Sequence, residues 1–337
     1  MENLPIDFAT IQEILQHFPV EIGEVTAFHN TSHGDKDIRW NFIFGESYVL
    51  KMNTGSLVWE GRLQEISRLI ARYRDIGVYC PALIPTREGP LSYTWQHEGM
   101  QFCCFVEEFA KYPTFGLDAQ FDRAQIVEHM GKLAAKYSNV DLSDTYSMFS
   151  IFDLNPFDVE VDEKQVETDT LVAALKEVGY ENLADRVDDL NKRIRARILP
   201  EFRKLPRCVF QGDLNGTNIL QQDGQFAGLI DFNGSGTDVN INVFLNETDC
   251  FPSNEEFASY TIPELVEAMF REQEKNSESI YRHYQRNALE MELYPCFQRI
   301  VMLFQYPNVC QMVRWLRDEK LREKCAQLIE ALVEKPL

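Results

Sequence analysis

A short segment rich in β-forming residues, residues 208–232, constrains the fold of this chain more than any other feature. It reads CVFQGDLNGTNILQQDGQFAGLIDF and lies between segments of mostly helical pattern. Its Asp223-Gly224 dipeptide indicates a two-residue hairpin turn, in which both central residues take positive φ. The runs NILQ and FAGLIDF are therefore predicted to pair as antiparallel strands, which brings Asn218 and Asp231 close together.

The N-terminal third is predicted to hold several strands and one helix. Residues 38–53 contain two strand-like runs around a central turn, and residues 101–109 form another apolar run of strand length. Residues 60–74 carry apolar side chains at spacings of three and four, which is typical of an amphipathic helix, and Gly77 ends it. A second amphipathic helix is predicted at residues 124–138.

The C-terminal part of the chain is predicted to be mostly helical. Residues 263–335 contain several helical stretches, with interruptions expected near Pro295 and Pro307. Strands early and helices late indicate an α+β, two-lobed fold. We expect a β-rich N-terminal lobe of residues 1–108 and a helical C-terminal lobe of residues 109–337.

The composition excludes several classes of protein. Hydrophobic residues make up 45% of the 337 residues, which allows a sizeable core and is unlike a disordered chain. The 33 basic and 53 acidic residues leave a net charge of −20, which disfavours nucleic acid as a partner. An acidic surface that aids solubility and an acidic pocket for a cationic substrate are both compatible with this charge.

The eight cysteines include no CxxC pair, so neither a zinc knuckle nor a thioredoxin-like site is predicted. The N-terminus lacks the basic and apolar regions of a secretory signal, and no run of eighteen apolar residues occurs. We therefore expect a cytoplasmic protein with no membrane segment, present as a monomer or a homodimer.

The combination of Asp213, Asn218 and Asp231 favours phosphoryl transfer with Mg²⁺. This reaction needs oxygen ligands that hold Mg²⁺ against the phosphates and a carboxylate that orients the attacking hydroxyl. Asn218 begins one strand of the predicted hairpin and Asp231 ends the other, so both can face one metal ion. Taken alone, Asp213 and Asn218 are equally compatible with an ordinary turn.

The runs QGDLNGTNIL at residues 211–220 and GLIDF at residues 228–232 resemble the aminoglycoside phosphotransferase and choline kinase superfamily. That family is a small-molecule branch of the protein-kinase-like fold. Its motif H-G-D-x-x-x-x-N is followed by an I-D-F/W motif at the spacing found in this chain. The resemblance implies that Asp213 is the catalytic base and that Asn218 and Asp231 bind Mg²⁺.

The resemblance extends to the N-terminal third. Lys51, in the run YVLK, is similar to the strand lysine that binds the α- and β-phosphates. The resemblance implies that its partner is Glu65 on the following helix, in preference to Glu60. Ser32 lies in NTSHGD, residues 30–35, which corresponds to the phosphate loop. This loop has one glycine, and in such kinases Ser or Thr and backbone N–H groups replace the others.

The remaining nucleotide contacts come from the run FVEEFA, residues 105–110, which resembles the hinge that binds adenine. The resemblance implies contacts at Glu108 and Ala110, and it assigns Ile230 to the same site. ATP is the expected nucleotide, with GTP as the alternative. Gln211 stands where the family usually has His.

The resemblance implies a small-molecule kinase that transfers the γ-phosphoryl group to a hydroxyl, and the acidic balance favours a cationic acceptor such as an aminoglycoside or amino alcohol. The alternatives are a catalytically inactive module that binds nucleotide, and a protein kinase. A protein kinase normally has an activation segment closing in A-P-E, which does not follow Asp231. Glu247 and Asp249 either line the acceptor pocket or lie on a solvated acidic loop, and Asp238 is expected to be structural or substrate-facing.

Overall fold

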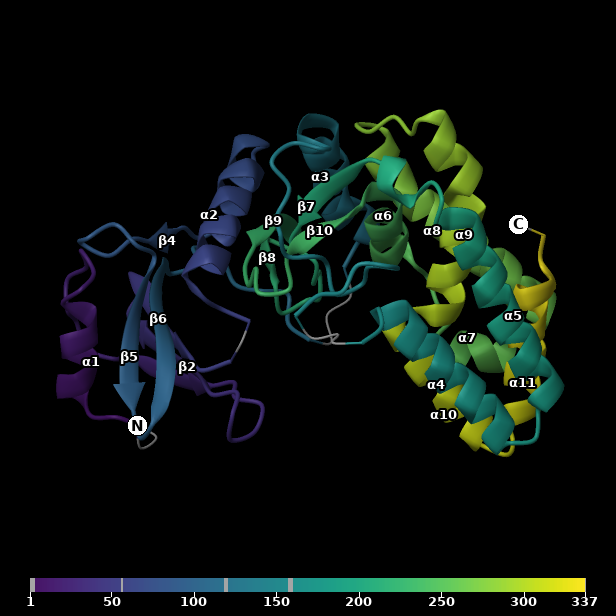
Figure 1. The fold of residues 1–337 in the computed structure, drawn as a ribbon, viewed down its shortest axis with the longest axis horizontal. Coiled ribbons are helices and arrows are strands. Elements are labelled where there is room, and N and C mark those ends of the chain that lie inside the picture. Colours follow the sequence, from purple (N-terminus) through teal and green to yellow (C-terminus); the bar gives the residue numbers. More distant parts are fainter. Residues whose placement is uncertain (1–3, 56, 118–120, 157–159, 337) are drawn as a thin grey trace. The chain divides into compact units, whose positions relative to one another are not determined.

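The chain forms two compact units in a computed structural model that describes residues 4–55, 57–117, 121–156 and 160–336 (Figure 1). The first unit comprises Met1–Phe121 and Asp213–Gly234, and the second comprises Asp122–Gly212 and Ser235–Leu337. The hairpin segment therefore belongs with the N-terminal part of the chain. This differs from the two consecutive segments, divided after residue 108, that the sequence suggested.

An antiparallel sheet and a separate hairpin form the body of the first unit. The elements of this unit are α1 (Phe8–Leu15), β1 (Ala27–Asn30), β2 (Arg39–Phe44), β3 (Tyr48–Asn53), α2 (Glu60–Asp75), β4 (Leu83–Ile84), β5 (Ser92–His97), β6 (Met100–Glu108), β8 (Ile219–Gln222) and β9 (Gln225–Leu229). The sheet has the order β1-β2-β3-β6-β4, and β5 pairs with the rest of β6. The strands and the helix that the sequence predicts in the N-terminal third are confirmed.

One face of this sheet is packed into a hydrophobic core. Trp40, Phe42 and Phe44 in β2 are buried and alternate with partly exposed residues, as expected for a strand with one covered face. The core also includes Ile11 and Leu15 of α1, so this helix covers that face. The sheet is therefore a rigid support for residues on its other face.

The β8–β9 hairpin has the turn that the sequence indicates. Asp223 and Gly224 have φ values of 52° and 76°, the positive values of a two-residue hairpin turn. The Leu229 amide donates to the Tyr79 carbonyl at 2.9 Å. Gly228 lies so close to the same carbonyl that a Cβ atom would be 2.2 Å from its oxygen. These contacts place the hairpin in the first unit.

Helices dominate the second unit. Its elements are α3 (Arg123–Tyr137), α4 (Glu163–Glu177), α5 (Glu181–Ile198), the 3₁₀ turn η1 (Phe202–Lys204), β7 (Arg207–Phe210), β10 (Gly236–Val239), α6 (Asn240–Thr248), α7 (Asn254–Ser259), α8 (Ile262–Tyr281), α9 (Ala288–Phe304), α10 (Tyr306–Arg317) and α11 (Arg322–Glu334). β7 and β10 pair antiparallel. Phe297, Trp315 and Leu328 lie in its core. This distribution of strands and helices confirms the predicted α+β class.

The two prolines that were expected to interrupt helices behave differently. Pro307 lies in the first turn of α10, where its missing N–H costs little, and α9 ends just before it. Pro295 lies inside α9, so the predicted interruption there is wrong. Leu293, Cys296 and Phe297 around it are buried, and this packing outweighs the loss of one backbone hydrogen bond.

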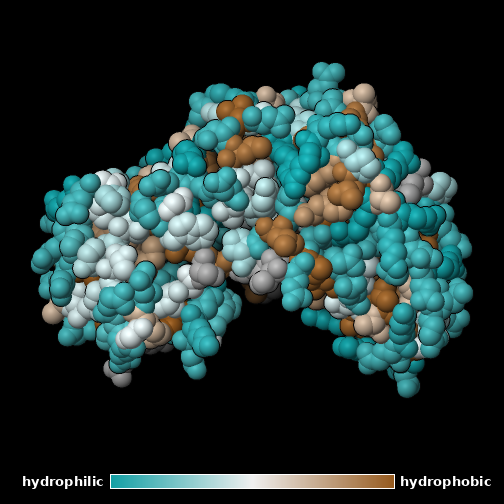
Figure 2. All heavy atoms as spheres, viewed as in Figure 1, coloured by the Kyte–Doolittle hydropathy of each residue, from teal (hydrophilic) through white to brown (hydrophobic). Residues whose placement is uncertain are grey.

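Figure 2 shows a mostly hydrophilic surface on the face drawn, with apolar residues in separate patches. Within the described residues, no helix combines the length and the apolar character that crossing a membrane requires. All eight cysteines are free thiols, and most of them are buried.

Gly131 allows α3 to pack closely against α8. A Cβ atom at this position would lie 2.2 Å from the carbonyl oxygen of Ile280. We expect Gly131→Ala to lower the free energy of unfolding by about 2 kcal/mol, because overpacking outweighs the higher helix propensity of Ala. Equilibrium denaturation measures this change. The control is Gly23→Ala, where an added Cβ atom would meet no neighbour within 4 Å, and it should change the free energy of unfolding by less than about 0.5 kcal/mol. Equal changes in the two variants would contradict this explanation.

Candidate active site

Two asparagine side chains hold Asp213 in place in the loop before β8. Asn215 Nδ2 donates to Asp213 Oδ1 at 2.8 Å, and Asn218 Nδ2 donates to Asp213 Oδ2 at 2.9 Å. Asn218 Nδ2 also donates to the Asp213 carbonyl oxygen at 3.1 Å. Both carboxylate oxygens are thereby oriented, which a residue that positions a reacting group requires.

Asp231 lies near this loop because the hairpin returns the chain. The Ile230 amide donates to the Asn218 carbonyl at 2.9 Å at the open end of the hairpin. Asp231 has φ of 54°, a left-handed conformation that Asp adopts more readily than most residues. Burial raises the pKa of Asp213 above its usual value, and the charge of Asp231 raises it further, against the hydrogen bonds from Asn215 and Asn218. The two carboxylates thus interact through their charges.

The oxygen atoms of this group fit a magnesium ion. Asn218 uses its Nδ2 to bond Asp213, so its Oδ1 is the atom that can bind a cation. Asp231 supplies a carboxylate. Mg²⁺ commonly uses one or two carboxylates, together with water and phosphate oxygens. Among the described residues, no group of three or more His, Cys, Asp or Glu side chains is arranged to hold a metal.

Lys51 forms its ion pair with a residue that the sequence did not indicate. Its Nζ lies 2.7 Å from Oε1 of Glu107 on β6. Glu65, the predicted partner, instead accepts from Arg62 Nη1 at 3.2 Å, so the predicted pair does not hold in this structure. Burial alone would lower the pKa of Lys51, but the charges of Glu107 and Asp231 outweigh burial and raise it. Lys51 is therefore a fully charged ammonium beside two carboxylates.

Helix α2 braces the turn that follows β9. Arg62 is almost completely buried, and its Nη2 donates to the Asn233 carbonyl at 3.2 Å. Farther along the helix, the rings of Tyr73 and Phe232 pack with centroids 5.7 Å apart. Glu65 thus neutralises a buried guanidinium, which would be costly without a partner. Glu65 therefore contacts the turn after Asp231 through Arg62, which bonds both Glu65 and the Asn233 carbonyl.

The end of β6, where the hinge is predicted, is tied to the segment before β4. The Glu108 amide donates to the Ala82 carbonyl at 2.9 Å. The Glu108 carboxylate accepts from the Ala82 amide at 2.9 Å and pairs with Arg74 at 2.7 Å. For Ala110, the described part of the chain offers no hydrogen-bond partner. Adenine binding by Glu108 and Ala110 remains a prediction.

Ile230 and Lys51 line one small cavity of about 20 Å³. Glu107 and Asp231 add charged atoms to it, and the remaining walls are mainly apolar, from Leu63, Ile66, Ile70, Pro81, Leu83, Phe105 and Phe232. A volume of this size holds about one water molecule. The cavity is therefore a gap beside the charged group rather than room for a nucleotide base.

Ser32 lies in the predicted loop between β1 and β2. Its hydroxyl donates to Asn30 Oδ1 at 2.6 Å and accepts from the Arg39 amide at 2.9 Å. These bonds close the loop on itself. The Ser32 hydroxyl therefore shapes the loop, and its contact with a phosphate group remains a prediction.

The acidic residues after the hairpin lie in the second unit, with Asp238 in β10, Glu247 in α6 and Asp249 directly after α6. Asp238 is buried in β10, where a backbone amide and an asparagine side chain donate to it, and burial raises its pKa to about 7. The Oε2 atom of Glu247 lies 3.6 Å from Nη2 of Arg123. Asp249 accepts from Asn308 at 2.5 Å, and burial raises its pKa to about 6. A solvated acidic loop is therefore the wrong description, because Glu247 lies in α6, which is buried throughout, and the Asp249 carboxyl is also buried.

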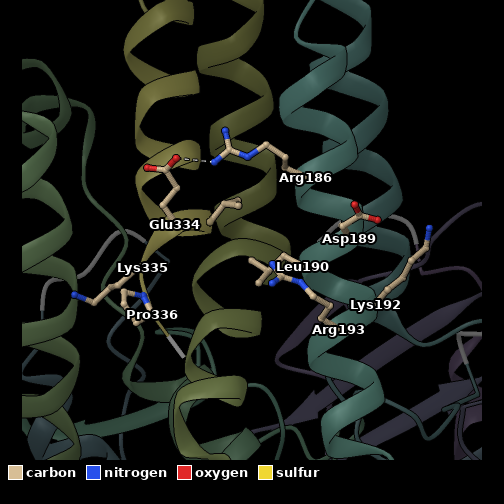
Figure 3. Close-up of a pocket in the computed structure, with 9 residues that line it drawn as sticks. Arg186, Asp189, Leu190, Lys192, Arg193, Glu334, Lys335 and Pro336 are labelled. Atoms are coloured by element: carbon tan, nitrogen blue, oxygen red, sulfur yellow. Dashed lines mark hydrogen bonds and ion pairs between the residues drawn. The ribbon is translucent and has the colours of Figure 1, made fainter.

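A cavity of about 790 Å³ lies between α5 and α11 in the second unit (Figure 3). Its lining is largely charged and includes Arg186, Lys192 and Arg193. Arg186 reaches toward α11 and donates to Glu334 at 2.8 Å, as Figure 3 shows. The nine residues that line it include none of the predicted site residues.

Sequence reasoning missed Glu107, Arg62 and Asn215. Asn215 occupies a variable position of the motif H-G-D-x-x-x-x-N, so the motif did not indicate a role for it. Arg62 adjoins the apolar stripe of a helix, where an arginine is normally read as solvent-exposed. Glu107 could have been identified, because it lies two positions from the apolar Phe105 and therefore on the same face of the strand.

Comparison with known proteins gives a family match. A family model described as the phosphotransferase enzyme family matches residues 38–239, a span that contains Lys51, Asp213, Asn218 and Asp231. This match confirms the resemblance that the motifs indicate. A search of curated proteins gives no match.

Solved structures share the fold at low sequence identity. An amicoumacin kinase in complex with AMP-PNP, Ca²⁺ and Ami is 13% identical, covers 98% of this chain and 94% of its own, and has a TM-score of 0.55. A microcompartment-associated aminopropanol kinase is 14% identical, with coverage of 97% and 95% and a TM-score of 0.51. A spectinomycin phosphotransferase in complex with ADP and spectinomycin is 13% identical, with coverage of 98% for both chains and a TM-score of 0.50. These likenesses confirm the predicted kinase-like fold.

The charge of Asp231 should be measurable in the titration of Asp213. We expect Asp231→Asn to lower the pKa of Asp213 toward its usual value, because a neighbouring negative charge that opposes ionisation is removed. Carboxyl ¹³C NMR of aspartate-labelled protein measures this pKa. Asp223→Asn, in the exposed hairpin turn, removes the same charge without affecting Asp213. A pKa of Asp213 that is unchanged in Asp231→Asn would show that the two carboxylates do not interact.

Proposed function

The chain belongs to the phosphotransferase enzyme family, and on that premise we propose that it transfers the γ-phosphoryl group of ATP to a hydroxyl of a small cationic acceptor. The observation that carries this proposal is the grouping of Asp213, Asn218, Asp231 and Lys51 within one unit. An oriented carboxylate, oxygen ligands for a cation, and an ammonium are the parts that phosphoryl transfer requires.

Asp213 acts as the base in this proposal. The acceptor hydroxyl donates to the Asp213 carboxylate, which takes the proton as the acceptor oxygen bonds to the γ-phosphorus. The bond between that phosphorus and the oxygen bridging to the β-phosphate breaks, and ADP leaves with the electron pair. Asn215 and Asn218 keep the carboxylate directed toward the hydroxyl, through their bonds of 2.8 and 2.9 Å.

The cations of the site act on the phosphates. Asn218 and Asp231 hold Mg²⁺, which supplies positive charge to the phosphate oxygens when bound. Lys51 is charged at neutral pH, because the carboxylates beside it raise its pKa despite burial, and it binds the same phosphates. Adenine is bound at the end of β6, near Glu108 and Ala110.

A cationic acceptor agrees with the acidic composition, since 53 acidic against 33 basic residues give a net charge of −20. Amino alcohols and aminoglycosides carry both an ammonium group and the hydroxyl that the reaction needs.

Substitution of Asp213 separates chemistry from binding. We expect Asp213→Asn to leave the affinity for Mg·ATP near that of the wild type, while turnover falls by at least about 10²-fold because the base is lost. Steady-state assays of ADP release and calorimetric titration of Mg·ATP measure the two quantities. Full activity in Asp213→Asn would refute its role as the base.

Substitution of Asp231 should have the opposite pattern. We expect Asp231→Ala to remove the part of ATP affinity that depends on Mg²⁺, since one of the two protein ligands is gone. Titrations with ATP in the presence of Mg²⁺ and of EDTA isolate that part. Asp223→Ala, in the exposed turn of the same hairpin, is the matched control. A Mg²⁺-dependent affinity that survives in Asp231→Ala would place the metal elsewhere.

The acceptor class can be tested with the wild-type enzyme. With Mg·ATP, we expect ATP consumption to be faster with amino alcohols or aminoglycosides than with neutral sugars of similar size, because the acidic balance of the chain favours a cation. A coupled assay of ADP release measures the rates. Preference for neutral sugars would contradict the cationic acceptor and leave phosphoryl transfer intact. Binding of Mg·ATP without turnover of any acceptor would instead favour an inactive nucleotide-binding module.

A further inference from the structure

The ion pair of Lys51 follows from the register of two neighbouring strands. β3 and β6 are antiparallel, and Lys51 lies directly opposite Phe105. Glu107 is two residues farther along β6, so it lies on the same face as Phe105 and diagonally across from Lys51. Long side chains in this relation can touch, and Lys51 Nζ and Glu107 Oε1 are 2.7 Å apart. Both side chains are mostly buried, with 17% and 18% exposed.

The glutamates at the start of α2 have other partners. Glu65 pairs with Arg62, which is 2% exposed and donates to the carbonyl of Asn233. Glu60 accepts from the amides of Leu91 and Ser92, at 3.0 and 2.9 Å. Glu65 thus offsets the buried charge of Arg62, and Glu60 accepts from backbone amides at the start of β5. Both residues therefore stabilise the placement of α2.

The surroundings of Lys51 make a permanent carboxylate partner necessary. Mainly apolar side chains form the remaining walls of the small cavity beside it, so an ammonium there loses much of its hydration. A bond to Glu107 uses one of the three N–H donors of the ammonium and leaves two for other acceptors. A phosphate oxygen can therefore be bound while the ion pair persists.

Resting on the proposed function, we propose that Glu107 on β6, and not a glutamate of α2, is the positioning residue that holds Lys51 for the phosphates of the nucleotide. Glu107 immediately precedes Glu108, where the hinge is predicted. One strand thus carries both the group that orients the lysine and the backbone that receives the base. Binding of the base and of the phosphates is coupled through β6, while α2 braces the metal motif through Arg62.

Direct binding measurements test this role. We expect Glu107→Gln to weaken Mg·ATP binding by roughly tenfold or more, the effect of losing a hydrogen bond to a charged group. In the Lys51→Met background, the same substitution should have no further effect, because Glu107 acts through Lys51. Glu65→Gln should weaken binding less than Glu107→Gln. Its effect on binding should persist in the Lys51→Met background, because Glu65 acts through Arg62. Glu46→Gln, in the exposed turn between β2 and β3, is the control for loss of one surface charge.

Titration of Lys51 gives a second readout, which a purely structural role would not change. In lysine labelled with ¹³C at Cε, Glu107→Gln should lower the pKa of Lys51, whereas Glu65→Gln should leave it in place. Tighter Mg·ATP binding in Glu107→Gln would show that Glu107 competes with the phosphates, and would overturn the proposal. The proposal would also be overturned if Glu65→Gln weakened binding while Glu107→Gln did not, and if the effect of Glu65→Gln disappeared in the Lys51→Met background. If the wild-type protein binds no Mg·ATP, the proposed function fails, and that result is distinct from either of these outcomes.

Discussion

The arrangement of the first unit depends on the interaction of the positively charged Lys51 with the carboxylates of Glu107 and Asp231. The ammonium is mostly removed from water, and such a charge is stable only with carboxylates beside it. Glu107 provides one from β6, and Asp231 provides another from the end of the hairpin. Three segments that are far apart in the sequence must therefore meet at this point. In the proposed function, this charged ammonium binds the phosphate oxygens.

The β8–β9 hairpin brings the remaining groups to this charge. Its two-residue turn returns the chain so that Ile230 bonds back to Asn218, and Asp231 follows at once. The loop before the hairpin uses Asn215 and Asn218 to hold Asp213. The hairpin bonds to Tyr79, and these residues are part of the unit that contains the N-terminal sheet. One compact unit thus contains the proposed base, the proposed metal ligands and the lysine proposed to bind the phosphates.

Much of this arrangement was predictable, and the exceptions have physical causes. The turn at Asp223 and Gly224 and the strand containing Lys51 were predicted correctly, because both depend on local backbone preference and on alternation of side chains. Pro295 was read as a helix break, but the burial of its neighbours overrides the local preference. The acidic residues around Glu247 are compatible with a solvated loop, yet helix α6 is buried throughout.

The sequence by itself determined that Asp213, Asn218 and Asp231 come together, since their spacing depends only on one loop and one tight turn. Short-range backbone geometry leaves few ways to place these oxygens. Only the tertiary structure decided which carboxylate holds Lys51. That choice depends on the register between β3 and β6, which joins residues more than fifty positions apart, and on Arg62, whose burial engages Glu65. Long-range pairing of charges is set by packing, and no local pattern in the sequence encodes it.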